Sequence, residues 1–230
     1  MKYALFDWDN TIRRGFTLFS WIDFLCKQGI LQERIFEKVN KIRRLYAAGN
    51  INHDDYAKLA CELYAEEMKG VQQEKRDRLI PMYIKSDQQS LFSFANSLFG
   101  LMLLYNIKPV IISGAPEYLV MQYKDAFGIY DIYAFSEKYD NGICTGEVAK
   151  NYGLKKKRIV EYLSDFFGER PVIGFGDSFS DIPIFNMSKH AFCIVDSKYN
   201  NKSYGEHVNY ISNKITGRQM GLLLGKILTS

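Results

Sequence analysis

The amino-acid sequence predicts an α/β fold, in which helices pack on a parallel sheet, with an all-helical segment inserted directly after the first strand. Short apolar runs that end in a polar residue or glycine are typical of buried parallel strands, because both faces of such a strand are covered. Segments of helical periodicity lie between most of these runs, which indicates right-handed crossovers. With 230 residues, of which 47% are hydrophobic, the chain can bury a substantial core without disulfides or metals.

Four apolar runs are the expected strands, at residues 3–6, 109–112, 172–175 and 191–195. After the second run, Pro116 suits the first turn of a helix that Gly128 can close. The segment 132–148 is expected to form a strand pair, since the sequence Asp-Asn-Gly at 140–142 favours a tight turn. The longest apolar segment, 91–105, contains serine, asparagine and glycine and is too short to span a bilayer, which indicates a buried helix.

From residue 17 to about residue 84 the pattern changes to successive helices. Apolar residues share one helical face in three stretches, namely Leu18, Trp21, Ile22 and Leu25, then Ile35, Val39 and Ile42, then Tyr56, Leu59, Ala60 and Leu63. Asn52 followed by Asp55 resembles a helix start. We therefore expect an α/β domain formed by residues 1–16 and 86–230, and a helical domain formed by residues 17–85.

Charge balance and cysteine usage narrow the class of protein. The sequence has 30 Lys and Arg against 26 Asp and Glu, and a formal charge of +4 is too small for dedicated nucleic-acid binding. Its four cysteines are scattered singly without metal-ligand spacing, which suits reduced thiols in a cytosol-like compartment. The N-terminus holds two carboxylates where a signal peptide needs its apolar stretch. We therefore expect a cytoplasmic protein that binds neither nucleic acid nor membranes.

Acidic residues follow two of the expected strands. Asp7 and Asp9 come directly after the first strand, and Asp177 and Asp181 follow the third. Alternate residues of an extended chain share a face, and ligands of α/β sheets bind at the carboxyl ends of the strands. Carboxylates gathered there cannot all remain ionised without a cation, and oxygen ligands favour Mg²⁺ over zinc or copper. The sequence therefore predicts a Mg²⁺ site at this edge.

An anion site is expected beside these acids. The second strand ends at Ser113 and Gly114, where a hydroxyl and a backbone N–H lead into a helix N-terminus. A phosphoryl group bridged to Mg²⁺ explains why acids and an anion site lie together. One carboxylate can then attack phosphorus while its neighbour transfers a proton.

Three motifs, in order along the chain, resemble the haloacid dehalogenase-like superfamily. Residues 7–11 (DWDNT) resemble its first motif, Ser113 its second, and residues 176–181 (GDSFSD) its fourth. The stretches after Ser113 and at 142–148 also resemble the branch that includes phosphoserine phosphatase. The resemblance covers residues 1 to about 196 and implies a three-layer Rossmann-like parallel sheet with an inserted all-helical cap domain.

The resemblance implies a role for each acid. Asp7 would be the nucleophile that forms an aspartyl-phosphate, and Asp9 the acid that protonates the leaving oxygen and then activates water. Asp7 and Asp177 would bind Mg²⁺ through their carboxylates, and Asp9 through its backbone carbonyl. Asp181 would support the metal site, and Thr11 would steady the turn.

The resemblance also implies ligands for the phosphoryl group. Ser113 and the N–H of Gly114 would hold its oxygens, and a lysine of the third motif would offset its charge. Residues 155–157 are three consecutive lysines, and each is a candidate. Lys156 is preferred because it lies three residues after Gly153, as in this branch.

The sequence therefore predicts a Mg²⁺-dependent phosphatase that hydrolyses a small phosphorylated metabolite through an aspartyl-phosphate. Two alternatives remain, a phosphotransferase or phosphomutase of the same superfamily and a non-catalytic phospho-acceptor binding module. A dehalogenase is disfavoured because Asp9 would have no function there. A basic RNA-binding protein that uses residues 155–158 is disfavoured because no aromatic or glycine signature accompanies them. The sequence leaves the oligomeric state and the substrate open.

One local departure argues against phosphoserine as the substrate. The phosphoserine phosphatase branch usually has a glutamate shortly after the first motif to hold the substrate's amino group, whereas residues 12–17 read IRRGFT. Arg13 and Arg14 in its place suit an anionic or larger substrate, although a solvated surface is an equal alternative for them. The aromatic residues of the helical domain are expected to form mainly its own core, with a few of them lining the pocket.

Overall fold

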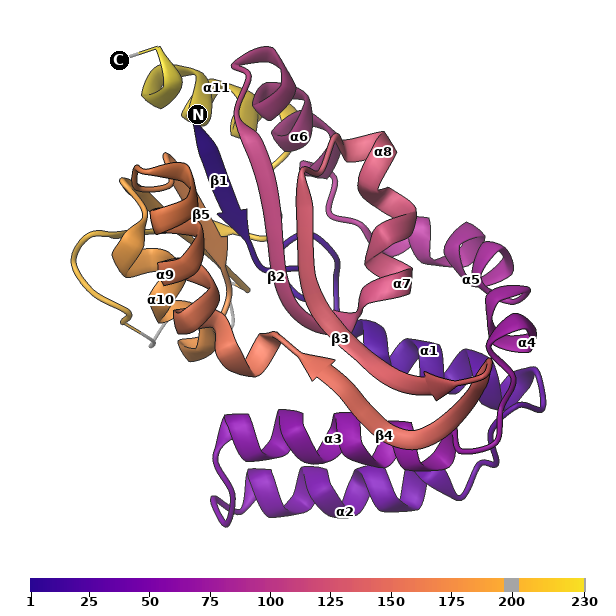
Figure 1. The fold of residues 1–230 in the computed structure, drawn as a ribbon. Helices are drawn as coiled ribbons and strands as arrows, with labels where there is room; N and C mark the ends of the chain where they lie inside the picture. The colour runs from indigo at the N-terminus through magenta and orange to yellow at the C-terminus, as the bar shows by residue number, and fades with distance from the viewer. Residues whose placement is uncertain (197–202, 230) are drawn as a thin grey trace.

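The computed structural model describes residues 1–196 and 203–229. Within them a seven-stranded sheet has the order β4-β3-β2-β1-β5-β6-β7 (Figure 1). The strands are β1 (Tyr3–Phe6), β2 (Lys108–Pro116), β3 (Asp131–Asp140), β4 (Ile143–Asn151), β5 (Ile173–Gly176), β6 (His190–Val195) and β7 (Val208–Ser212). All neighbouring strands pair in parallel except β3 and β4, which form an antiparallel hairpin. This mostly parallel sheet confirms the predicted fold class.

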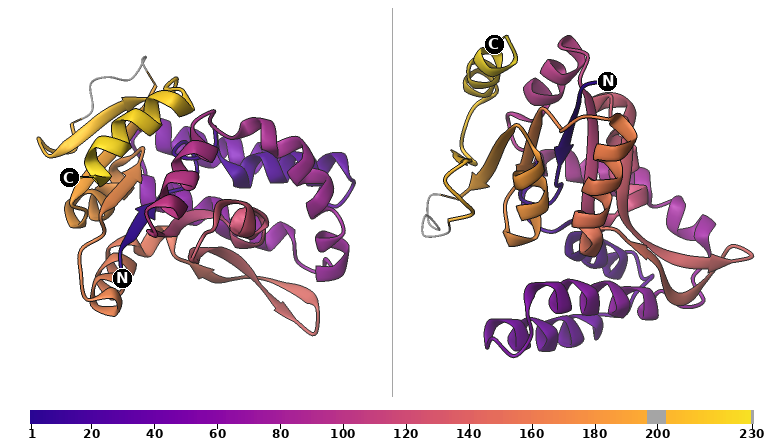
Figure 2. Two further views of the ribbon diagram at one scale, coloured as in Figure 1. Left: turned by 90° about the horizontal axis from the view of Figure 1, so that it is seen from above. Right: turned by 60° about the vertical axis from the view of Figure 1, so that its left-hand side comes forward.

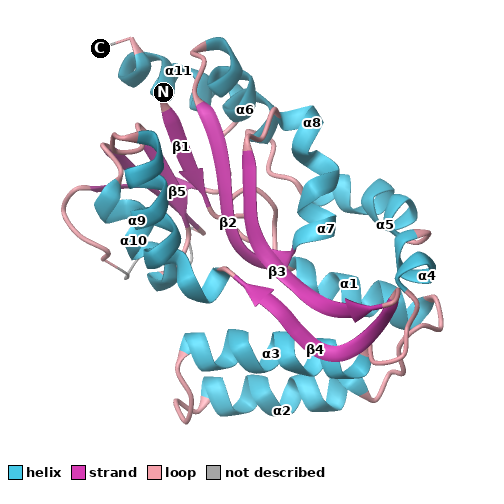
Figure 3. Cartoon of the chain, in the orientation of Figure 1, coloured by secondary structure: helices cyan, strands magenta, loops and turns pink. Residues whose placement is uncertain are grey.

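Helices cover both faces of the sheet and give the three layers (Figure 3). One face is covered by α9 (Lys156–Phe167) and α10 (Ile182–Met187), and the other by α6 (Ala95–Leu104), α7 (Glu117–Val120), α8 (Lys124–Phe127) and α11 (Gly217–Leu228). Tyr3 and Leu5 pack with the α9 side, whereas Ala4 and Phe6 pack with the α6 side, because successive residues of a strand point to opposite faces. Both faces of β1 are therefore buried, which explains its unbroken apolar run.

Between β1 and α6 the chain forms five helices, of which α1, α2 and α3 lie beyond the carboxyl ends of the central strands (Figures 1 and 2). The five helices are α1 (Thr17–Lys27), α2 (Ile35–Ala47), α3 (His53–Glu67), α4 (Gln73–Asp77) and α5 (Ile80–Asp87). Their apolar faces form a separate core, in which the Trp21 indole N–H donates to the Tyr64 hydroxyl at 3.0 Å. The Asn52 side chain accepts from the Asp55 N–H at 2.8 Å and caps α3, which confirms the predicted helix start.

The β3–β4 hairpin joins this helical segment to the sheet. Phe135 and Cys144 of the hairpin are buried in the core of the helical segment. The N–H of Gly70 donates to the Cys144 carbonyl at 2.9 Å, and the N–H of Cys144 donates to the Val71 carbonyl at 2.9 Å. The predicted strand pair at 132–148 is therefore confirmed, and it packs on the helices as well as on the sheet.

Parts of the chain differ from the sequence-based expectations. Within residues 91–105, only α6 is an α-helix. Its Leu103 and Leu104 are 78% and 74% exposed, so the prediction of a buried helix is wrong for one face of α6. The helix after Pro116 is divided into α7, a 3₁₀ turn and α8, and Gly128 ends it in the left-handed conformation, with φ of 60°. Strand β7 and helix α11 are additions to the expected elements.

None of the helices in the described residues has the length and apolar character needed to cross a bilayer.

Candidate active site

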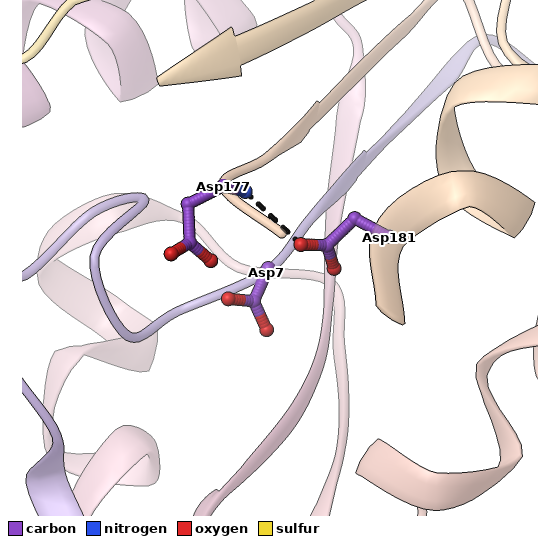
Figure 4. A group of neighbouring side chains, drawn as sticks. All are labelled: Asp7, Asp177 and Asp181. Atoms are coloured by element: carbon purple, nitrogen blue, oxygen red, sulfur yellow. Dashed lines mark hydrogen bonds between the residues drawn. The ribbon is translucent and has the colours of Figure 1, made fainter. Parts of the chain in front are cut away.

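Three aspartates gather at the carboxyl ends of two adjacent central strands (Figure 4). Asp7 follows β1, Asp177 follows β5, and Asp181 lies one turn further along the chain. Because β1 and β5 pair in parallel, their carboxyl ends meet at the same edge of the sheet. One carboxylate oxygen from each aspartate lies within 4.8 Å of the other two. The fold thus brings together acids that are about 170 residues apart in the sequence.

Lys156 places a positive charge inside this cluster. Its Nζ donates to Asp7 Oδ1 at 2.7 Å and to Asp181 Oδ1 at 2.5 Å, and the residue is only 6% exposed. Burial alone would lower the pKa of Lys156, but the carboxylates of Asp181 and Asp7 raise it, so the amine remains protonated. Lys155 and Lys157 are both exposed to solvent. Of the three consecutive lysines, Lys156 is therefore the one that reaches the acids.

Asp181 is held in place through both of its carboxylate oxygens. Oδ2 accepts from the N–H groups of Asp177 and Ser178, each at 3.0 Å, and from the Ser178 hydroxyl at 3.1 Å, while Oδ1 accepts from Lys156. A Cβ at Gly176 would lie 2.4 Å from the Asp181 Cβ, so the turn requires glycine there. Asp181 therefore positions the loop that carries Asp177, rather than offering an uncommitted oxygen to a ligand.

The two remaining acids of the cluster hold their protons unusually tightly. Burial raises the pKa of Asp7 to about 7, with Lys156 lowering it and Asp181 raising it. Burial, followed by the charges of Asp181 and Asp7, also raises the pKa of Asp177. One ammonium group cannot offset three carboxylates, so negative charge remains when all are ionised. A divalent cation with oxygen ligands fits this set of donors.

Asp9 lies two residues beyond Asp7 and is bound by the first turn of α1. Its carboxylate accepts from the backbone N–H of Thr17 at 3.0 and 3.1 Å and from the Thr17 hydroxyl. Burial raises the pKa of Asp9 to about 6, and the bonds from Thr17 and the charge of Arg13 limit this rise. A carboxyl group with a pKa near 6 suits a residue that both donates and accepts a proton near neutral pH.

Ser113 and Gly114 lie near the carboxyl end of β2, which continues to Pro116 instead of ending at them as predicted, on the other side of Asp7 from Asp177. Ser113 is 1% exposed, and its Oγ accepts from the Ala115 N–H at 3.2 Å. A Cβ at Gly153 would lie 2.5 Å from the Gly114 nitrogen, so only glycine allows this close backbone approach. The contact brings the turn before α9, and with it Lys156, against the end of β2. Steric exclusion of a side chain therefore explains why glycine stands at position 153, three residues before Lys156.

All six residues predicted to act in catalysis or binding line one pocket of about 400 Å³, namely Asp7, Asp9, Ser113, Gly114, Lys156 and Asp177. The opposite side of this pocket comes from the helical segment, through the residue before α1 and residues of α1, α2 and α3. Their lining residues include Phe16, Phe19, Arg43, Tyr46, His53 and Tyr56. The sequence indicated that some aromatic residues would line the pocket, but which ones depends on how three helices pack together.

Arg13 and Arg14 lie outside this pocket; Arg14 is exposed, as the surface alternative predicts, whereas Arg13 fits neither alternative because it is buried. Arg13 is 3% exposed, and its Nε and Nη2 donate to Asp87 Oδ1 at 2.9 and 2.7 Å. Arg14 donates to the Leu91 carbonyl at 2.9 Å and lies over the Phe92 ring. Both guanidinium groups are thus engaged with the chain that returns from the helical segment to the sheet.

Comparison with known proteins identifies the family. The model of the haloacid dehalogenase-like hydrolases matches residues 4–186, and the chain belongs to this family. No curated protein sequence matches the chain at a significant level.

Several solved structures have the same fold. A phosphoserine phosphatase solved as a phospho-aspartyl intermediate analogue has a TM-score of 0.68 and 18% identity, over 97% of this chain and 98% of that one. A protein of unknown function from Bordetella pertussis has a TM-score of 0.76 and 16% identity, over 92% and 98% of the two chains. A phosphoserine phosphohydrolase-like protein from Francisella tularensis has a TM-score of 0.66 and 14% identity, over 97% and 100%.

Proposed function

We propose that the protein is a Mg²⁺-dependent phosphatase that hydrolyses a small phosphomonoester through an aspartyl-phosphate. The main support is the buried contact of Lys156 with Asp7, in a pocket that also holds Asp9 and Ser113. This arrangement offers a nucleophile, a proton donor and a cationic phosphate ligand within one small volume. Membership of the hydrolase family and the fold shared with phosphoserine phosphatases support the same reaction class.

In the proposed reaction, a carboxylate oxygen of Asp7 attacks phosphorus and the bond from phosphorus to the ester oxygen breaks. Asp9 donates its proton to that leaving oxygen, so the alcohol departs neutral. Asp9 then accepts a proton from water, whose oxygen attacks the phosphorus of the aspartyl-phosphate and releases phosphate and Asp7. The pKa of Asp9, raised to about 6, allows it to act in both directions near neutral pH.

In this proposal the phosphoryl oxygens are held by groups from two elements, β2 and the first residue of α9. The Lys156 ammonium, the Ser113 hydroxyl and the Gly114 N–H would surround them. The carboxylates of Asp7 and Asp177 and the backbone carbonyl of Asp9 would bind the Mg²⁺ ion. When bound, this ion offsets the charge of the phosphoryl group and of the aspartates. Asp181 keeps Lys156 and the Asp177 loop in position through its four hydrogen bonds.

Residues 17–85 would act as the cap domain that covers the pocket. The aromatic residues of α1, α2 and α3 face the phosphate-binding side across the pocket. A covered site excludes bulk water during phosphoryl transfer and admits only small phosphorylated molecules. A phospho-acceptor module has no need of such a cover, which favours the enzyme over that alternative. The scattered cysteines support a cytoplasmic location.

Phosphate release from a panel of phosphomonoesters tests this proposal. The wild type is expected to release phosphate with Mg²⁺ and to lose that activity when the metal is chelated. The Asp7→Asn variant keeps the side-chain shape but lacks the nucleophile, so its turnover should fall at least about a thousandfold. If no phosphomonoester is turned over, or if Asp7→Asn is as active as the wild type, the proposal is wrong.

The same assay separates hydrolysis from transfer to an alcohol. Added ethanol or glycerol should leave the phosphoryl group mainly on inorganic phosphate if water is the acceptor. Predominant formation of a new phosphate ester would instead identify a phosphotransferase that uses the same aspartate.

A further inference from the structure

The pocket has two chemically different sides. The sheet side contributes carboxylates, a lysine, hydroxyl groups and backbone N–H groups. The helical side contributes mainly rings and small apolar side chains, namely Phe16, Leu18, Phe19, Tyr46, Tyr56, Ala57, Ala60 and Cys61. The phosphoryl group accounts for the polar side. The alcohol portion of the substrate must therefore lie against the apolar side.

The rings on the helical side contact one another and form a continuous wall. Phe16 packs edge-on against Phe19 with ring centroids 5.9 Å apart, and Phe19 lies 6.2 Å from Tyr56. Tyr56 stacks on Tyr46 at 4.9 Å with an interplanar angle of 20°. Because each ring is held by its neighbour, the wall exists before a ligand binds and loses little conformational entropy on binding.

Small side chains beside this wall leave room for a ligand. Ala57, Ala60 and Cys61 of α3 line the pocket directly after Tyr56. An alanine or cysteine at these positions keeps the pocket wide next to the ring of Tyr56. A flat group can therefore lie against the wall without displacing a large side chain.

Charged side chains also line the helical side of the pocket. Arg43 and Asp54 line the pocket and are exposed to solvent. The Cζ of Arg43 lies over the ring of Phe19, 5.5 Å from its centroid. Arg13, which follows the first motif in the sequence, is buried against Asp87 instead. The buried lining residues of this side, namely Leu18, Tyr56, Ala60 and Cys61, therefore carry no charge.

We propose that the substrate is a phosphomonoester whose alcohol portion carries a flat, largely apolar ring that packs on Phe19, Tyr46 and Tyr56. This inference rests on the proposed phosphatase function, because the ring wall matters only if the sheet side holds the phosphoryl group. In this proposal the helical segment determines which substrate is preferred, whereas residues on the sheet side carry out phosphoryl transfer.

Three primary alkyl esters of similar intrinsic reactivity test this inference. We expect kcat/KM for 2-phenylethyl phosphate to exceed that for ethyl phosphate and for O-phosphoserine by at least about tenfold, mainly through a lower KM. Equal or lower kcat/KM for 2-phenylethyl phosphate would overturn the ring preference while leaving the phosphatase function intact. Failure of all three esters, and of a wider panel, would instead reject the phosphatase function itself.

A fourth ester distinguishes a ring from any apolar chain. Hexyl phosphate matches the apolar character of the phenylethyl group but is flexible, so it gains less from stacking on preorganised rings. We expect its kcat/KM to be about three- to tenfold lower than that of 2-phenylethyl phosphate. A kcat/KM for hexyl phosphate as high as that for 2-phenylethyl phosphate would overturn the assignment of a ring.

Variants of the wall locate the preference. Tyr46 is 40% exposed, so Tyr46→Ala should leave the protein folded while removing part of the stacking surface. We expect Tyr46→Ala and Phe19→Ala to reduce kcat/KM for 2-phenylethyl phosphate about three- to tenfold more than that for ethyl phosphate. Tyr130→Ala is the matched control, because Tyr130 is 39% exposed and lies outside the pocket. A similar loss on both esters, or the same change in Tyr130→Ala, would contradict the proposed wall.

Discussion

At the scale of single residues, the main feature of the site is that one buried lysine faces three aspartates. Lys156 is shared between Asp7 and Asp181, and the third acid, Asp177, receives no bond from it. The three carboxylates therefore carry more negative charge than one ammonium group can offset, and a bound divalent cation would offset the remainder.

Removal of the buried ammonium should destabilise the fold as well as stop turnover. In Lys156→Met, Asp7 and Asp181 lose their buried partner, and we expect the free energy of unfolding to fall by about 3 kcal/mol. Lys155→Met changes an exposed neighbour and should alter it by less than about 0.5 kcal/mol. Urea denaturation of the two variants without added metal measures the difference, and equal effects would show that Lys156 is not the paired lysine.

The pKa of Asp7 predicts how the metal-free protein responds to pH. A folded-state pKa of about 7 exceeds the ordinary aspartate value of 3.8, so the folded protein binds this proton more tightly than the unfolded chain. The resulting stability is present at low pH and is lost as pH rises through 7. Between pH 5.5 and 8 we expect a loss of about 2 kcal/mol from this group.

The Asp7→Asn variant is the control for this pH effect. Asparagine does not titrate, so the variant should lose less stability between pH 5.5 and 8 and should be more stable than the wild type at pH 8. Thermal denaturation in the presence of a chelator measures both. The same pH dependence in the two proteins would mean that Asp7 does not titrate in this range.

At the scale of elements, α1 connects the helical segment to Asp9 of the candidate active site. Its first residue, Thr17, supplies both a backbone N–H and a hydroxyl to Asp9, so the position of α1 fixes the carboxylate that we propose as the proton donor. A movement of α1 away from the sheet would change the environment of Asp9. The helical segment and Asp9 are therefore linked through the N-terminus of α1.

Loss of the Thr17 hydroxyl should shift the pH dependence of turnover. Thr17→Val keeps the shape and the backbone N–H but removes one bond that lowers the pKa of Asp9. We expect the limb of the pH–rate profile that reports Asp9 to move upward by about 0.5 to 1 pH unit. Thr145→Val, at a half-buried position of β4 outside the pocket, is the control. A lower rate with an unmoved profile would show that Thr17 has only a structural role.

The two chain segments that connect the helical segment to the sheet are tied by a buried ion pair. Arg13 precedes α1 and Asp87 ends α5, and their side chains are 4% and 2% exposed. The hydroxyl groups of Tyr83 and Tyr123 also donate to Asp87, at 3.1 and 3.0 Å. This network sets where the helical segment begins and ends relative to the sheet.

A double-mutant cycle tests the strength of this connection. We expect Arg13→Met and Asp87→Leu to be coupled by at least about 1.5 kcal/mol in unfolding free energy, because each single change leaves a buried charge unpaired. The exposed pair of Lys27 and Asp23 should show less than about 0.5 kcal/mol in the same experiment. Coupling of equal size in both pairs would mean that burial adds nothing to the first.

The sequence predicts elements well where one local signal determines them. Strands β1 (Tyr3–Phe6) and β5 (Ile173–Gly176) lie within one residue of the apolar runs predicted at 3–6 and 172–175, and Asn52 carries the side chain that caps α3. Strand β7 lacks such a signal because it lies at the sheet edge, where only Val208 and Ile211 are buried. The pairing of Arg13 with Asp87 could not be predicted either, since 74 residues separate them and only the folded chain brings them together.

At the scale of the whole molecule, the site lies between two structural parts with different tasks. The sheet gathers strand ends from distant parts of the chain, and its motifs are short enough to be recognised in the sequence. The pocket wall depends on the relative packing of α1, α2 and α3, which no short motif describes. The proposed reaction class can therefore be inferred from the sequence, whereas the proposed substrate preference rests on the structure.

The central claim is that Asp7 receives the phosphoryl group. Borohydride reduction during turnover, followed by mass spectrometry of the peptides, measures this most directly, because it converts an acyl phosphate to an alcohol and marks the aspartate that carried it. We predict substrate-dependent and Mg²⁺-dependent conversion of Asp7 to homoserine. Conversion of another aspartate, such as Asp177 or Asp181, in an enzyme that turns over its substrate would contradict the account.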